Sequence, residues 1–191
     1  MIDKTRLAEK CSTWNIALTG AQLDMLDRYA ALLVDYNQKV NLTAITTPEG
    51  IEDRHFADSL LFAAQPEVQG ALVDVGTGAG FPGIVAKIFK PDLQLTLMEP
   101  TGKRVEFLRY VCGELGLSGV EFVKERAEEA ARKVWRERFT VAGDAPHYLY
   151  LAEHFYATAG EKINLIVFYP LYPFLVGLLG DPPPTRTGGA L

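Results

Sequence analysis

The feature that most constrains the fold of this chain is a run of glycines directly after an apolar strand. Residues 71–75 are typical of a short buried β-strand, and Gly76-Thr-Gly-Ala-Gly80 follows them at once. Glycine lets the backbone turn tightly and lets a ligand approach where a Cβ would collide. Residues 81–89 have the apolar content of a helix, whose first turn offers free N–H groups. A strand, a glycine loop and a helix in this order predict an α/β fold with a ligand at the loop.

The chain beyond the loop continues the same alternation. We expect a strand at residues 93–98, a helix at 103–117, a strand at 120–123 and a charged helix at 126–138. Strands and helices in this order form a parallel sheet with right-handed crossovers.

The first 70 residues are predicted to be helical. Thr19 and Gln22 have the spacing of a capping box. The apolar stripe of the helix that follows is formed by Leu23, Leu26, Ala30, Leu33 and Val34. Residues 41–48 interrupt the pattern as a loop, and a second helix is expected from about Pro48 to Ala64. We therefore expect an N-terminal helical region at 1–70 and a core at 71–142.

The spacing of the glycines indicates which ligand the loop binds. Dinucleotide sites need G-x-G-x-x-G. Counted from Gly76, the third glycine position is Phe81; counted from Gly78, it is Gly83, but Phe-Pro then stands where a pyrophosphate would pass. The pattern favours a ligand without phosphates, and we expect Asp74 to face that ligand's amino or ammonium group.

An acidic residue supports this interpretation. Glu99 stands at the end of the second predicted strand, where nucleoside-binding proteins place an acid that accepts hydrogen bonds from ribose hydroxyls. The alternative is an exposed charge at a strand end.

Three stretches resemble the ribosomal RNA small-subunit methyltransferase G family, also called glucose-inhibited division protein B. They are Tyr36-Asn-Gln-Lys-Val-Asn-Leu-Thr-Ala-Ile-Thr46, Arg54-His-Phe-Ala-Asp-Ser-Leu60 and Asp74-Val-Gly-Thr-Gly-Ala-Gly-Phe-Pro-Gly83. Lys103-Arg-Val-Glu-Phe-Leu108 and Arg126-Ala-Glu128 continue the match, which covers about residues 15–139. The first two stretches are more specific than the glycine loop, which many methyltransferases share.

The resemblance implies a Rossmann-like methyltransferase fold with an N-terminal helical extension. It implies N7-methylation of a guanine in 16S ribosomal RNA, with S-adenosylmethionine as cofactor and the small ribosomal subunit as partner. The implied cofactor contacts are Gly76, Gly78, Phe81, Glu99, Ala127 and Glu128. Considered alone, residues 126–128 could equally be an ordinary helix start. No catalytic residue is assigned.

The candidates for RNA contact are Asn41, His55, Lys103 and Arg104. His55 and Asp58 are three residues apart and would share a helix face, where a solvated pair is the plain alternative. Asn41 could equally form a turn. The basic residues near Lys103 could contact phosphates, or they could be balanced by the acidic residues among them.

Composition narrows the class of protein further. The formal net charge is −5, which argues against a chain that coats nucleic acid through bulk charge. Two cysteines and three histidines lack metal-ligand spacing, so we expect no metal site. The N-terminus has no apolar signal core, and we expect a cytoplasmic monomer.

The resemblance stops at about residue 139. Residues 140–147 replace a Thr-Ala-Arg-Ala-Val-Ala segment of the family, and the tail at 143–191 is poor in charge and rich in proline. Residues 163–180 carry no charge, but their prolines argue against a membrane span. Strands are expected at 140–142 and 163–169, and the sheet could be incomplete. A truncated or frameshifted, non-catalytic relative of the family is therefore the alternative function.

Overall fold

A parallel sheet with the strand order β3-β2-β1-β4 forms the centre of the computed structural model, which describes residues 1–66, 68–126 and 165–168. The strands are β1 (Ala71–Val75), β2 (Gln94–Met98), β3 (Val120–Val123) and β4 (Leu165–Phe168). β1 pairs in parallel with both β2 and β4, and β2 pairs in parallel with β3. All four carboxyl ends therefore point to one edge of the sheet, as the predicted α/β fold requires.

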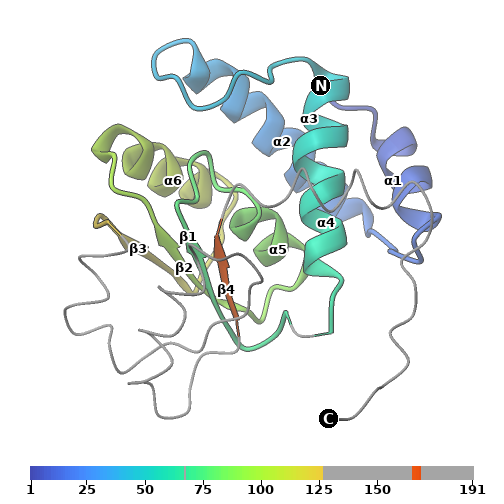
Figure 1. Ribbon diagram of the computed structural model, residues 1–191. Coiled ribbons are helices and arrows are strands. Elements are labelled where there is room, and N and C mark those ends of the chain that lie inside the picture. Colours follow the sequence, from blue (N-terminus) through green and yellow to red (C-terminus); the bar gives the residue numbers. More distant parts are fainter. Residues whose placement is uncertain (67, 127–164, 169–191) are drawn as a thin grey trace.

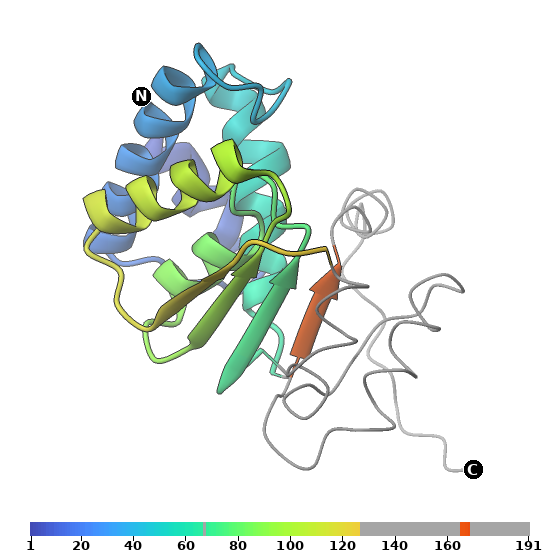
Figure 2. The same ribbon diagram turned by 90° about the vertical axis from the view of Figure 1, so that its left-hand side faces the viewer.

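Two helices connect β1, β2 and β3, and the helices of the N-terminal region cover these strands. The connecting helices are α5 (Gly83–Phe89) and α6 (Gly102–Glu114). The preceding helices are α1 (Lys4–Ser12), α2 (Gly20–Asn37), α3 (Pro48–Ile51), the π-helix η1 (Glu52–Ala57) and α4 (Asp58–Ala63). In Figures 1 and 2 the described helices lie on one side of the sheet. The N-terminal helices thus pack directly on the α/β core.

The sequence expectations for α2 are confirmed. The Thr19 hydroxyl accepts a hydrogen bond from the Gln22 N–H, and the Gln22 side-chain oxygen accepts one from the Thr19 N–H, which completes the capping box. Of the expected stripe, Leu26, Ala30 and Leu33 are buried. Tyr29 and Leu32 are buried as well, which widens the apolar face beyond the expected stripe.

The segment expected as one helix from Pro48 to Ala64 is helical but not uniform. α3 is a single turn that begins with a proline, η1 follows it as a π-helix, and α4 completes the segment. A π-helix has a longer repeat than an α-helix. The burial pattern in this segment therefore differs from that of a regular α-helix.

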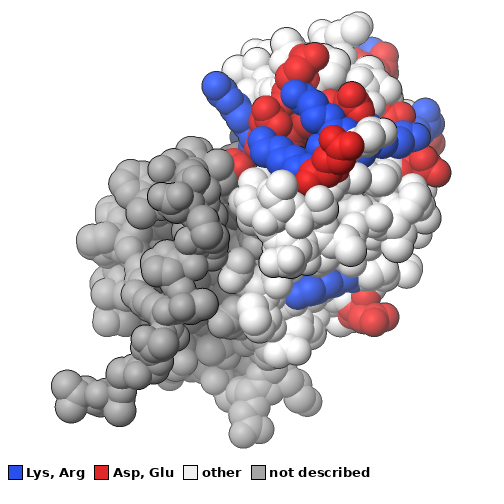
Figure 3. Space-filling model, turned by 90° about the vertical axis from the view of Figure 1, so that its right-hand side faces the viewer, with Lys and Arg blue, Asp and Glu red and all other residues white. Residues whose placement is uncertain are grey.

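Ion pairs join α1 to its neighbours. Arg6 pairs with the buried Glu52 of η1, and Lys10 pairs with Asp53. Lys and Arg are interleaved with Asp and Glu on this side of the molecule (Figure 3). The mixture shows a surface whose charges compensate each other.

Other expectations fall partly or wholly outside the described residues. The helix at 126–138 lies there except for Arg126, which is not in a helix, and the strand at 140–142 lies there entirely. The strand expected at 163–169 is present as β4. Within the described part of the chain, none of the helices has the length and apolar character needed to cross a membrane.

Candidate functional site

The glycine loop lies at the carboxyl edge of the sheet, between β1 and α5 (Figure 1). The N–H of Gly76 donates to the Met98 carbonyl at 2.8 Å, so the loop begins as an extension of the β1–β2 pairing. Gly76, Gly78 and Gly80 have φ angles of 73°, 57° and 98°, which side chains with a Cβ rarely adopt. The backbone of the loop thus explains these three glycines.

Gly78 leaves open space where a ligand could approach. The nearest atom to a Cβ built on this residue is the Gly76 carbonyl oxygen, at 3.9 Å. The backbone N–H of Gly78 donates to the Glu99 carboxylate at 3.2 Å. The loop and the acid that follows β2 are therefore in contact.

Glu99 is held firmly at this position. Its side chain is buried and also accepts a hydrogen bond from the Thr101 N–H, at 2.9 Å. The Arg104 guanidinium lies 3.8 Å from the same carboxylate. Glu99 is therefore not the exposed strand-end charge of the alternative interpretation. A carboxylate fixed beside open glycine backbone can accept hydrogen bonds from a diol such as ribose.

Asp74 braces the loop from inside, which corrects our expectation that it faces the ligand. Its side chain is fully buried and accepts hydrogen bonds from the Thr77 hydroxyl at 2.6 Å and from the Gly83 N–H at 2.9 Å. Burial raises the pKa of Asp74 to about 7; the two hydrogen bonds oppose this shift, and the nearby charge of Glu99 adds to it. The loop is thus closed by a carboxyl group that has no contact with solvent.

Phe81 is buried among rings that come from the N-terminal helices. Its ring stacks on the His55 ring with 4.2 Å between centroids, and on Tyr29 with 5.2 Å. Phe56 contacts it at 6.1 Å. Since the side chain is only 3% exposed, a cofactor contact of Phe81 would have to use its backbone.

The two motifs that precede the glycine loop meet it in space. His55, offered as an RNA contact, is buried in this structure together with Asp58, so neither belongs to a solvated pair. The Nε2 atom of His55 lies 3.0 Å from the Thr43 hydroxyl. Burial lowers the pKa of His55 to about 4 and raises that of Asp58 to about 7. The His55 motif therefore has a packing role beside the loop.

The turn after α2 depends on a residue that the sequence analysis did not single out. The side-chain Oδ1 atom of Asn37 accepts hydrogen bonds from the N–H groups of Leu42 and Thr43, and its Nδ2 atom donates to the Thr43 carbonyl. Asn41, the RNA candidate, is exposed. Asn37 lies inside the matched motif, but sequence alone does not show which of two asparagines closes a turn.

The other expected site residues are distributed as follows. Lys103 is exposed on the first turn of α6, and Arg104 is half-buried beside Glu99. Arg109 lies over the Phe122 ring, with its guanidinium carbon 4.7 Å from the ring centroid. The residues at positions 127 and 128 lie outside the described part of the chain.

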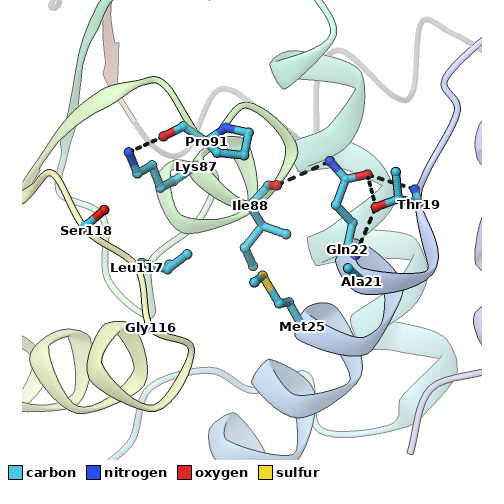
Figure 4. A pocket seen from close by; sticks show the side chains of 10 residues that line it. All are labelled: Thr19, Ala21, Gln22, Met25, Lys87, Ile88, Pro91, Gly116, Leu117 and Ser118. Carbon is cyan, nitrogen blue, oxygen red and sulfur yellow. Dashed lines mark hydrogen bonds between the residues drawn. The ribbon is translucent and has the colours of Figure 1, made fainter.

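A cavity of about 390 Å³ lies at the opposite, amino edge of the sheet (Figure 4). Its walls are the start of α2, the end of α5 and the turn before β3: Thr19, Ala21, Gln22, Met25, Lys87, Ile88, Pro91, Gly116, Leu117 and Ser118. The buried Lys87 ammonium donates to the carbonyls of Pro91 and Leu93, so it serves to close a turn. This cavity is separate from the glycine loop.

Comparisons with known proteins agree with this geometry. A family described as rRNA small subunit methyltransferase G matches residues 22–141. A protein of that name from Moorella thermoacetica is 44% identical over 146 residues, which are 74% of this chain and 61% of the relative. One from Alkaliphilus metalliredigens is 42% identical over 178 residues, 92% of this chain and 69% of the relative.

Solved structures share the fold at low sequence identity. The O-methyltransferase TomG from Streptomyces achromogenes, solved in complex with SAM, gives a TM-score of 0.51 at 18% identity, covering 97% of this chain and 81% of TomG. A putative O-methyltransferase from Klebsiella pneumoniae gives 0.51 at 19% identity, covering 85% and 71%. The methyltransferase fold expected from the sequence is thereby confirmed.

Proposed function

Because this chain belongs to the rRNA small subunit methyltransferase G family, we propose that it binds S-adenosylmethionine at the glycine loop and methylates N7 of a guanine in 16S ribosomal RNA. The observation that carries the proposal is the contact between the Gly78 N–H and the Glu99 carboxylate, at 3.2 Å. It joins the open part of the loop to an acid that can hold ribose. The family match adds the methyl acceptor.

The residues fit this cofactor better than a dinucleotide. Glu99 would accept hydrogen bonds from the ribose hydroxyls, and the backbone of Gly76 and Gly78 would approach the cofactor without a Cβ in the way. Ala127 and Glu128 remain proposed adenine contacts. When bound, S-adenosylmethionine supplies an electrophilic methyl group.

The reaction requires little acid–base catalysis by the protein. Guanine N7 has a free lone pair, so the transfer of a methyl group to it needs no general base and no covalent nucleophile. The protein must align N7 with the methyl group and exclude water, which is catalysis by proximity and orientation. We propose Asn41, Lys103 and Arg104 as RNA-side residues, and a cytoplasmic monomer as the working form.

Isothermal titration calorimetry of the full chain with S-adenosylmethionine tests the cofactor site. Glu99→Gln is expected to weaken binding at least tenfold, whereas Glu106→Gln, an exposed change on α6, should leave it unchanged. Gly76→Val should abolish binding, since valine rarely adopts a φ of 73°. Unchanged affinity in both site variants would refute the assignment.

A non-catalytic relative is the second candidate, and one observation favours it. The chain spans only 61% of the first relative and 69% of the second, and the family match ends at residue 141. Transfer of tritium from labelled cofactor to small-subunit RNA separates the two candidates. Cofactor binding without methyl transfer would identify the chain as a binding remnant.

A further inference from the structure

The glycine loop receives hydrogen bonds and ring contacts from outside the α/β core. The hydroxyl of Tyr29, in α2, donates to the Ala79 carbonyl at 2.5 Å, and Tyr29 itself is fully buried. A Cβ built on Gly80 would lie 2.6 Å from that hydroxyl. Tyr29 is therefore hydrogen-bonded to the loop, and it lies so close to Gly80 that a side chain there would collide with its hydroxyl.

A second contact reaches the loop from η1. The His55 ring lies almost parallel to the Phe81 ring, at an interplanar angle of 5° and a centroid distance of 4.2 Å. His55 is in turn fixed by the Thr43 hydroxyl, whose oxygen also accepts a hydrogen bond from the Ile45 N–H. The turn after α2 is thus connected through His55 to the residue that follows the last loop glycine.

We propose that Tyr29 and His55 are positioning residues that hold Ala79 and Phe81 so that the glycine loop keeps the conformation that receives the cofactor. This inference rests on the proposed function, because it concerns the same loop. It assigns to the N-terminal helical region a role in cofactor binding that the strand–loop–helix motif does not contain. Neither residue needs to touch the cofactor for this role.

Physical reasons support an effect on the loop rather than on the whole fold. Ala79 lies between Gly78 and Gly80, which both have positive φ angles, and its carbonyl accepts the hydrogen bond from the Tyr29 hydroxyl. The N–H groups of Gly80 and Phe81 on the same turn donate to the Thr77 carbonyl, so their exchange reports on the turn. Without the hydroxyl of Tyr29, the Ala79 carbonyl would lose its partner at a buried position. The aromatic packing of the Tyr29 ring would remain, because phenylalanine has the same ring.

Backbone amide hydrogen exchange of the full chain without ligand tests the positioning role directly. In Tyr29→Phe we expect exchange at Gly78, Gly80 and Phe81 to become about tenfold faster, with the amides of β2 unchanged. The matched control is Tyr36→Phe, which removes a hydroxyl from the same helix at a ring that contacts Phe107 rather than the loop. Unchanged loop exchange, or an equal increase in β2, would overturn the proposal.

A second pair of variants tests His55 without changing its ring. Thr43→Val removes the hydroxyl that fixes Nε2 and should speed exchange at Phe81, whereas Thr43→Ser keeps the hydroxyl and should restore the slow rate. If valine and serine behave alike, His55 does not position the loop. This pair remains informative should Tyr29→Phe fail to fold.

Calorimetry with S-adenosylmethionine separates this proposal from the proposed function. Tyr29→Phe should raise Kd about three- to tenfold relative to the wild type and to Tyr36→Phe. A wild-type chain that binds no S-adenosylmethionine refutes the proposed function, and the exchange data still decide whether the loop is held. Wild-type binding with an equal Kd in Tyr29→Phe refutes the positioning role alone.

Discussion

Gly83 packs so closely against Asp74 that no side chain larger than hydrogen fits at position 83. A Cβ on Gly83 would lie 2.7 Å from the Asp74 Oδ2 atom and 2.8 Å from a Leu97 methyl group. Gly113, in α6, is also helical, but a Cβ there meets nothing within 4 Å. The two glycines therefore occupy the same type of secondary structure for different reasons.

Alanine substitution at these two sites should change stability in opposite directions. Gly83→Ala is expected to lower the free energy of unfolding by about 1–3 kcal/mol, because the core would be overpacked. Gly113→Ala should raise it by up to about 1 kcal/mol, since alanine is the better helix former. Urea denaturation measures both. If the two variants changed the free energy of unfolding equally, the residues around Gly83 would have to move to accommodate the added methyl group.

His55 gives stability a predictable dependence on pH. Burial lowers its pKa from 6.5 to about 4, so between these values the unfolded state binds more protons than the folded state. The contribution of the neutral His55 to the free energy of unfolding is therefore complete above pH 6.5 and is lost as the pH falls toward 4. The shift corresponds to roughly 3 kcal/mol.

The measurement must separate His55 from two carboxyl groups with the opposite sign. The raised pKa values of Asp58 and Asp74, each about 7, remove stability as the pH rises above 3.8. The advantage of the wild type over His55→Gln should shrink as the pH falls from 6.5 to 4. A His55 ring that titrates near 6.5 by NMR would contradict the prediction.

At the scale of elements, the contact of α1 with η1 shows which ion pairs stabilise the fold. Glu52 is 2% exposed and accepts hydrogen bonds from the Asp3 N–H and the Arg6 side chain. The neighbouring pair, Lys10 with Asp53, has side chains that are 38% and 44% exposed. The first pair anchors the start of α1, and the second lies in solvent.

Removing the two carboxylates should therefore have unequal effects. Glu52→Ala is expected to destabilise by about 2 kcal/mol or more, since the Asp3 N–H and the Arg6 guanidinium lose a buried, charged hydrogen-bond acceptor. Asp53→Ala should cost less than about 1 kcal/mol, as for exposed ion pairs. Thermal unfolding at low and high salt is the measurement. A similar loss in both variants would show that α1 is not docked through Glu52.

The sequence predicted those elements whose pattern is local. β1 and β3 have the expected bounds, and the capping box of α2 is complete, because alternation and capping depend on neighbouring residues. The π-helix η1, which packs against α1, was not predicted. The role of Tyr29 depends on a contact between segments 50 residues apart. Asn37 and Asp74 make local hydrogen bonds within turns, whose geometry the sequence pattern does not specify. Their residue types are common in ordinary helices and turns.

At the scale of the whole molecule, β4 adds to the sheet a strand from beyond the part of the chain that the family model matches. Its residues lie beyond the end of the family match at 141, yet the backbone pairs in parallel with β1, with Val167 opposite Asp74. The strand was expected from an apolar run at 163–169. The sheet thus takes its fourth described strand from a segment beyond the end of the family model, within the stretch aligned to the Alkaliphilus metalliredigens relative.

Proline substitutions in β4 test this pairing. Successive N–H groups of a strand point to opposite sides, so one of Ile166 and Val167 donates toward β1 and the other points away. Of Ile166→Pro and Val167→Pro, we expect one to cost about 3 kcal/mol and the other much less, because proline removes a ladder hydrogen bond in only one case. Urea denaturation of both variants decides the matter. A large loss of unfolding free energy in both variants would indicate a further strand beyond β4. A negligible loss in both would show that residues 165–168 do not contribute to the stability of the sheet.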